Sequence, residues 1–232
     1  MATIKKQLKM KRILLIMYLS GVTLFAQNSN DITQVDKSQT DKLSIPTEES
    51  TIEVKINNRL ENEDLQTLFD FENINQSEFT FTGESIKDKF YVVRVKEFLN
   101  GELINTKILF DERGTEFFRI DTTETSFKLL TKVDKDEIKV WLKGDRFGSK
   151  RAYFPTFDSN GVYVAKDFYG WETVLKENSE EPFHLMSVIT PNRSEDGSAS
   201  YCKVAQSDID PEEFGKEFNI PHYFLIEIEF TK

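Results

Sequence analysis

The sequence predicts a mainly β protein, an antiparallel β-sandwich of jelly-roll-like or similar topology with one or two short helices. Two observations support this fold class. Many short segments alternate apolar with polar residues, which is the period of a half-buried strand. Turn residues separate these segments and little helical periodicity lies between them, a pattern that favours a sandwich or barrel over a parallel α/β sheet.

The N-terminus has the three parts of a secretory signal peptide. A basic start precedes the apolar run Ile13 to Phe25, and Ala26 is the expected last residue before cleavage. The run has 13 residues, whereas a membrane-spanning helix needs roughly 20. A core helix or a retained anchor is the alternative. We predict that residues 1–26 are a signal peptide and that the chain is periplasmic or extracellular. The basic residues are Lys5, Lys6, Lys9, Lys11 and Arg12.

The rest of the chain divides into a polar leader and one domain. Residues 27–50 hold few large apolar side chains, so they are expected to form a flexible leader. Residues 51–232 are predicted to form a single β-sandwich domain. Removing the signal peptide takes away five positive charges and moves the formal net charge from −10 to −15. This balance disfavours nucleic acid and anionic membranes as partners.

The domain is expected to open with a strand and a short helix. Apolar residues occupy every second position of residues 50–58, which predicts a strand. Apolar residues of the next segment recur like one face of a helix, and Asn58 is the expected cap. The helical face holds Leu60, Leu65, Leu68 and Phe69.

Residues 89–112 predict a β-hairpin. Asn100-Gly101 is the dipeptide that a two-residue type I′ turn prefers, because both positions need a positive φ. Folding the two strands about this turn gives a register with one apolar and one polar face. The expected pairs are Tyr91 with Phe110, Val93 with Ile108, Val95 with Thr106, Glu97 with Ile104, Arg94 with Lys107 and Lys96 with Asn105.

Further strands are expected at short spacing, with one helical turn before the last of them. Asp210 followed by Pro211 is typical of a helix start. In the final strand the apolar residues from Phe224 to Phe230 are expected to face the core, while Glu227 and Glu229 face water. The predicted strands are residues 115–121, 126–133, 136–143, 151–157, 161–165, 183–190, 201–206 and 222–230.

No motif of a known catalytic type occurs in the chain. His184 and His222 are its two histidines, and each is expected to be a structural residue with satisfied nitrogens. Cys202 is the sole cysteine, so an intramolecular disulfide is excluded and a buried, inert thiol is expected.

The segment 151–171 is unusually aromatic, with seven Phe, Tyr and Trp residues among its 21. We predict that Tyr163, Tyr169 and Trp171 contact a ligand from an exposed surface, with Asp158 and Asn160 as polar partners, because exposed aromatic rings beside polar side chains suit sugars and partner proteins. The alternative is that these rings only seal one end of the sandwich.

No cofactor or metal is predicted, with calcium as the one candidate. Oxygen-bearing side chains lie close together in residues 158–161 and 207–213, as a calcium site requires. Neither segment matches an EF-hand loop, and Asp and Asn beside Gly also make ordinary turns.

Taken together, these features predict an exported, non-catalytic binding or interaction module. A glycan or another envelope protein is the expected partner. One alternative is a secreted glycan hydrolase that uses two carboxylates. The other is a structural protein of the cell envelope without a small ligand.

Overall fold

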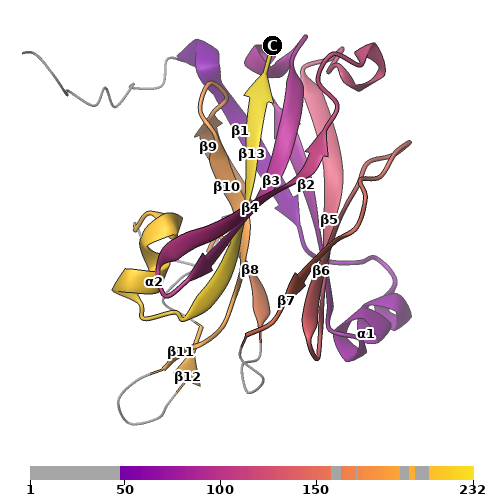
Figure 1. The fold of residues 1–232 in the computed structure, drawn as a ribbon. Helices are drawn as coiled ribbons and strands as arrows, with labels where there is room; N and C mark the ends of the chain where they lie inside the picture. Colours follow the sequence, from indigo (N-terminus) through magenta and orange to yellow (C-terminus); the bar gives the residue numbers. More distant parts are fainter. Residues whose placement is uncertain (1–47, 158–162, 171, 194–198, 202–208) are drawn as a thin grey trace, which may run out of the picture. The chain divides into compact units, whose positions relative to one another are not determined.

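A computed structural model describes residues 48–157, 163–170, 172–193, 199–201 and 209–232 (Figure 1). They belong to one compact unit, Ser44–Lys232. Two large antiparallel sheets and two short α-helices dominate this unit, which confirms the predicted mainly β sandwich. The predicted signal peptide and residues 27–47 of the predicted leader lie outside the described residues.

The first sheet has six strands in the order β7-β6-β5-β2-β1-β9. The second has five strands in the order β4-β3-β13-β10-β8, so that β4 and β8 are its edges. The strands of the first are β1 (Thr51–Asn57), β2 (Ile74–Thr82), β5 (Glu124–Asp134), β6 (Glu137–Lys143), β7 (Ala152–Pro155) and β9 (Val174–Asn178). Those of the second are β3 (Phe90–Leu99), β4 (Glu102–Asp111), β8 (Val164–Asp167), β10 (Phe183–Ile189) and β13 (His222–Thr231).

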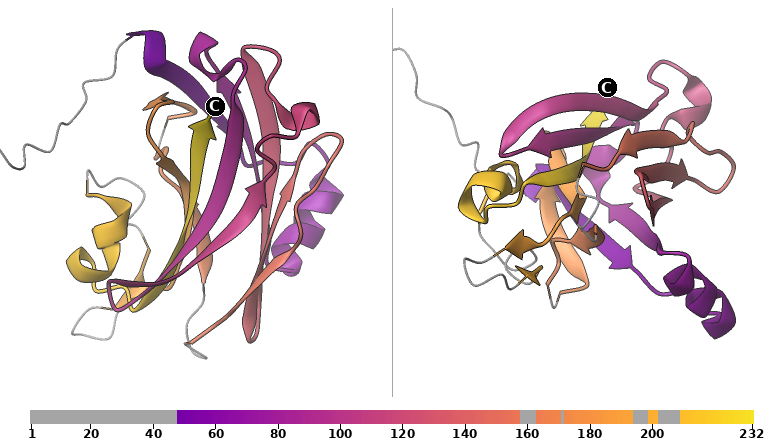
Figure 2. Two further views of the ribbon diagram at one scale, coloured as in Figure 1. Left: turned by 45° about the horizontal axis from the view of Figure 1, so that its top comes forward. Right: turned by 60° about the horizontal axis from the view of Figure 1, so that its bottom comes forward.

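Helices and a small third sheet complete the unit. Helices α1 and α2 lie on opposite outer sides of the two large sheets (Figure 2). Within the described residues no helix has the length and apolar character needed to cross a membrane. The remaining elements are β11 (Asn192–Arg193), β12 (Ala199–Ser200), α1 (Glu63–Phe71), α2 (Phe214–Glu217), η1 (Glu48–Ser50), η2 (Glu84–Ile86), η3 (Glu116–Phe118) and η4 (Pro211–Glu213).

Aromatic rings fill much of the space between the large sheets. Phe81 on β2 is fully buried in this space. Its ring centroid is 5.3 Å from that of Phe127 on β5 and 5.5 Å from that of Phe230 on β13. The contact between β2 and β13 joins the two sheets directly, since each strand belongs to a different one. The predicted inward face of the last strand is therefore confirmed.

A second apolar cluster covers the outer face of the five-stranded sheet. Phe214 of α2 is buried against Phe98 of β3 and Tyr223 of β13. The hairpin turn fixes α2 here, because a Cβ added at Gly215 would come within 2.5 Å of the Cα of Gly101. This packing holds the segment before α2 over the outer face of β13.

The hairpin of β3 and β4 has the predicted turn but not the whole predicted register. Asn100 and Gly101 both have positive φ, and Leu99 pairs with Glu102 as expected. Register shifts at Glu97/Phe98 and at Val93/Arg94 then move the pairing by one residue each. The predicted pairs beyond Phe98 are therefore wrong: Glu97 pairs with Asn105, Lys96 with Thr106, Val95 with Lys107, Arg94 with Ile108 and Val93 with Phe110.

Most other predicted elements are present, with three differences. The helix α1 forms, but its cap is Asn62, whose side chain accepts from the backbone nitrogen of Leu65, and not Asn58. Residues 116–118, predicted as strand, form the 3-10 turn η3. Strands β2, β9, β11 and β12 were not predicted. Of the predicted strand 201–206, all but Tyr201 lies outside the described residues.

Candidate functional site

A cavity of about 640 Å³ lies between β9, β10 and the segment that leads into α2. This volume falls in the range of small-ligand sites, roughly 300 to 1,000 Å³. Its wall combines aromatic and aliphatic side chains with four carboxylates and one histidine. The apolar lining residues are Phe168, Leu175, Pro182, Phe183, Ile209, Pro211 and Phe214, and the polar ones are Glu177, His184, Asp210, Glu212 and Glu227.

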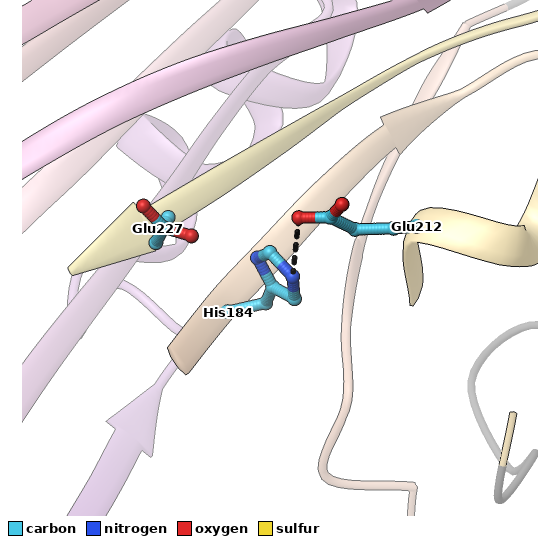
Figure 3. Close-up of side chains that lie close together, drawn as sticks. All are labelled: His184, Glu212 and Glu227. Atoms are coloured by element: carbon cyan, nitrogen blue, oxygen red, sulfur yellow. Dashed lines mark ion pairs between the residues drawn. The ribbon is translucent and has the colours of Figure 1, made fainter. Parts of the chain in front are cut away.

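One wall of the cavity is a charged cluster in which His184 lies between Glu212 and Glu227 (Figure 3). The Nε2 atom of His184 is 3.7 Å from Oε1 of Glu212. The Lys96 ammonium donates to both carboxylates, at 2.7 Å to Glu212 and 2.5 Å to Glu227. Burial alone would lower the pKa of Lys96, but the hydrogen bonds and charges of the two glutamates outweigh it and raise that pKa. The cluster therefore holds its lysine firmly in the charged form.

Four separate segments bring this cluster together. Glu227 and Lys96 lie on the neighbouring strands β13 and β3, and His184 lies on β10, where it pairs with Glu227. Glu212 arrives from η4, which begins where the Asp210 side chain accepts from the backbone nitrogen of Glu212. The predicted Asp210 cap is thus confirmed, and it begins the turn that carries Glu212.

Glu227 is the residue that the sequence pattern placed wrongly. Its position in β13 predicted a side chain in water, yet it is only 6% exposed. The reason is that η4 covers this part of the outer face of the sheet and brings Glu212 to the same lysine. Alternation predicts which face a residue occupies, but not whether another segment covers that face.

The Nδ1 atom of His184 is buried and has no hydrogen-bond partner among the described residues. This contradicts the expectation that both its nitrogens are satisfied. Burial is the largest influence on the ring and lowers the pKa of His184, with Glu227 acting in the opposite direction. At neutral pH the ring is therefore uncharged, and its contact with Glu212 is not an ion pair.

We expect the His184→Asn variant to lose part of the acid sensitivity of the protein. Because the folded state holds the pKa of His184 below its ordinary value of about 6.5, the unfolded chain binds more protons just below that pH. The contribution of His184 to the free energy of unfolding is complete above about pH 6.5. It is lost as the pH falls toward the pKa that His184 has in the folded state. When the free energy of unfolding, measured with urea, is plotted against pH between about pH 5 and 7.5, it should change less steeply for the variant than for the wild type. Equal slopes would contradict a depressed pKa.

Glu177 on β9 also lines the cavity. Burial raises the pKa of its carboxyl group. No cationic side chain forms an ion pair with it in the part of the chain that the structure describes. Tyr169 lies close enough that the charge of Glu177 adds to burial in raising the pKa of the Tyr169 phenol. The cavity thus contains a half-buried carboxylate that has no cationic partner among the described residues.

The cluster does not favour a metal ion. His184, Glu212 and Glu227 are the one group of three His, Cys, Asp or Glu residues among the described residues whose ligand atoms come within 4.8 Å of one another. A divalent cation would have to displace the Lys96 ammonium, which already bridges both carboxylates. In the candidate calcium segments, Asp210 is used as a helix cap, and residues 158–161 lie outside the described residues.

The predicted ligand contacts fall into two groups. Asp158, Asn160 and Trp171 lie outside the described residues. Tyr163 and Tyr169 are 3% and 6% exposed, so the expected exposed position of these two rings is wrong. Both pack into the main core, where their large apolar area is buried. The same aromatic segment does reach the cavity, through Phe168. Whether any of the five residues binds a ligand stays a prediction.

Tyr163 belongs to a buried polar network around His222. The Tyr163 hydroxyl lies 2.6 Å from Nδ1 of His222, and Nε2 of His222 lies 3.2 Å from Oε1 of Glu97. Asn105 donates to the other oxygen of Glu97 at 3.1 Å. Both nitrogens of His222 thus have partners, as expected of a structural histidine. Cys202, the other residue considered for chemistry, lies outside the described residues.

Comparison with known proteins identifies no relative of this chain. No protein-family model matches the chain, and neither the curated proteins nor the solved structures give a match.

Proposed function

We propose that the chain is an exported, non-catalytic binding module whose site is the cavity lined by Glu177, His184 and Phe214. Export is proposed from residues 1–26 alone. The proposed ligand is an organic cation with an apolar body, such as an aryl or alkyl ammonium group or the side chain of a basic peptide. Glu177 carries the proposal, because it is a half-buried carboxylate that lacks a cationic partner among the described residues.

The lining of the cavity supports a cationic ligand in two further ways. Phe168, Phe183 and Phe214 line the cavity, and aromatic rings attract an ammonium or guanidinium group by cation–π interaction. An anionic ligand would instead meet four carboxylates.

The two alternatives predicted from the sequence have less support. A glycan hydrolase needs two carboxylates that face its substrate, whereas the best-placed pair, Glu212 and Glu227, is bridged by Lys96. A structural protein without a ligand would leave Glu177 half-buried with no partner among the described residues. Glycan binding through Trp171 is the other outcome that the binding experiment below distinguishes.

A charge series of matched ligands tests the proposal. We expect phenethylammonium to bind with a Kd of about 1 mM, uncharged 2-phenylethanol more weakly, and 3-phenylpropionate not at all. Binding is measured by NMR titration of the backbone amides. Glu177→Gln should weaken phenethylammonium binding by about fivefold, since a partly buried charge pair is worth on the order of 1 kcal/mol.

Glu137→Gln, an exposed acid on β6, is the control and should leave the affinity unchanged. Equal binding of the cation and the anion would overturn the proposal. The proposal would also be overturned if oligosaccharides bound while amines did not. That result would indicate that the aromatic segment 151–171 holds the binding site.

A further inference from the structure

Strand β4 is a long edge. Among the described strands only β3 pairs with it, and every residue from Glu102 to Ile108 is exposed. Three of these residues are large and apolar: Leu103, Ile104 and Ile108 are 49%, 47% and 57% exposed. Edge strands with free backbone groups pair readily with other strands, so proteins usually protect them with proline, charge or short length. This edge has ten residues and no proline.

The sequence of β4 is nearly palindromic about Thr106. It reads Leu-Ile-Asn-Thr-Lys-Ile-Leu from Leu103 to Leu109. If a second copy of β4 lies antiparallel to the first with the two Thr106 residues opposite each other, Ile104 of each copy faces Ile108 of the other. The two-fold symmetry repeats each pair, as it does in an isologous interface. The other pairs are Leu103 with Leu109 and Asn105 with Lys107.

This register is also favourable for charge. The chain has a formal net charge of −10, yet no acidic residue lies between Leu103 and Leu109. The one charged residue of the stretch, Lys107, faces Asn105 and not a second lysine. Like charges that lie directly opposite each other would destabilise the pairing, and apolar pairs stabilise it.

The polar side chains of the stretch already have partners within the same chain. Asn105 donates to Glu97 at 3.1 Å, and the Lys107 ammonium lies 5.2 Å from the ring centroid of Phe154 on β7. Pairing through β4 therefore uses backbone groups and apolar side chains without breaking these contacts.

We infer that two copies of this chain associate through β4, forming one continuous sheet across the two-fold axis. Strands that pair at their edges keep the same face of the sheet on the same side. Lys96 pairs with Thr106 in the adjacent strand and bonds Glu212 and Glu227. The Lys96, Glu212 and Glu227 clusters of the two copies would therefore lie on the same face of the joined sheet, where both sites can engage one multivalent target.

Charge substitutions at the symmetry axis test this pairing in the full-length chain. We expect the wild-type chain to have twice the mass of one chain by sedimentation at about 100 µM, where even weak interfaces are populated. Thr106→Lys places two ammonium groups opposite each other, and Thr106→Glu two carboxylates, so each variant alone should be a monomer. An equimolar mixture of the two variants should again dimerise, because lysine then faces glutamate.

Tyr153→Lys is the matched control, since Tyr153 is exposed on β7, an edge of the other sheet. It should leave the dimer intact. A wild-type chain that stays monomeric at this concentration would overturn the inference, as would a Thr106→Lys variant that still dimerises. Failure of the mixture to dimerise would exclude the register centred on Thr106.

Discussion

Phe81→Ala is expected to lower the free energy of unfolding by about 3 to 5 kcal/mol, the cost of removing a large aromatic side chain from a packed core. Phe81 is fully buried, and its ring packs against rings of both sheets, those of Phe127 and Phe230 among them. The cavity left behind cannot close without moving one sheet toward the other. Urea unfolding followed by far-UV circular dichroism measures the change.

The same substitution at Phe71 is the control for Phe81. Phe71 ends α1 and is 80% exposed, so Phe71→Ala should change stability by less than about 0.5 kcal/mol. Similar losses for the two variants would mean that the ring cluster between the sheets is not the main source of stability.

Lys96→Met is expected to cost about 3 kcal/mol, because it leaves the buried carboxylate of Glu227 without its closest cation. Arg94 approaches Glu227 only to 3.5 Å and is already bonded to Glu229. Without the ammonium between them, Glu212 and Glu227 also repel each other. Adding Glu227→Gln to the variant removes this buried charge and should restore most of the lost stability.

Lys132→Met provides the comparison for Lys96. Lys132 forms an equally short ion pair, 2.7 Å from Glu72, but that glutamate side chain is 41% exposed. A pair in such contact with water contributes little to stability, so Lys132→Met should cost clearly less than Lys96→Met. If Lys96→Met cost no more than Lys132→Met, the cluster beside the cavity would be an ordinary surface network.

The sequence predicted the sandwich well wherever local patterns determine structure. Alternation in β13 identified its core face, and Asn100-Gly101 identified the hairpin turn. The register of the hairpin was lost at Glu97/Phe98, because a bulge adds one residue to one strand and alternation does not reveal where. Residues 116–118 are rich in phenylalanine yet form a 3-10 turn, since Phe118 is held by packing against Phe110 and Phe147.

The candidate site was much less predictable than the fold. Glu177, His184, Glu212 and Glu227 come from β9, β10, η4 and β13, and no local motif connects them. A weak signal did exist: His184 is the one ionisable residue in the largely apolar stretch 182–189. The aromatic segment drew attention to Tyr163 and Tyr169, but long aromatic runs in a sandwich mostly supply core.

The most direct test of the proposed function is an NMR titration of the two histidine rings with phenethylammonium. The chain has only His184 and His222, and they lie in different environments, the first lining the cavity and the second bonded to Tyr163 and Glu97. We predict a saturable shift of the His184 ring signals with those of His222 unchanged. No shift at His184, or an equal shift there with 3-phenylpropionate, would contradict a site for cations in this cavity.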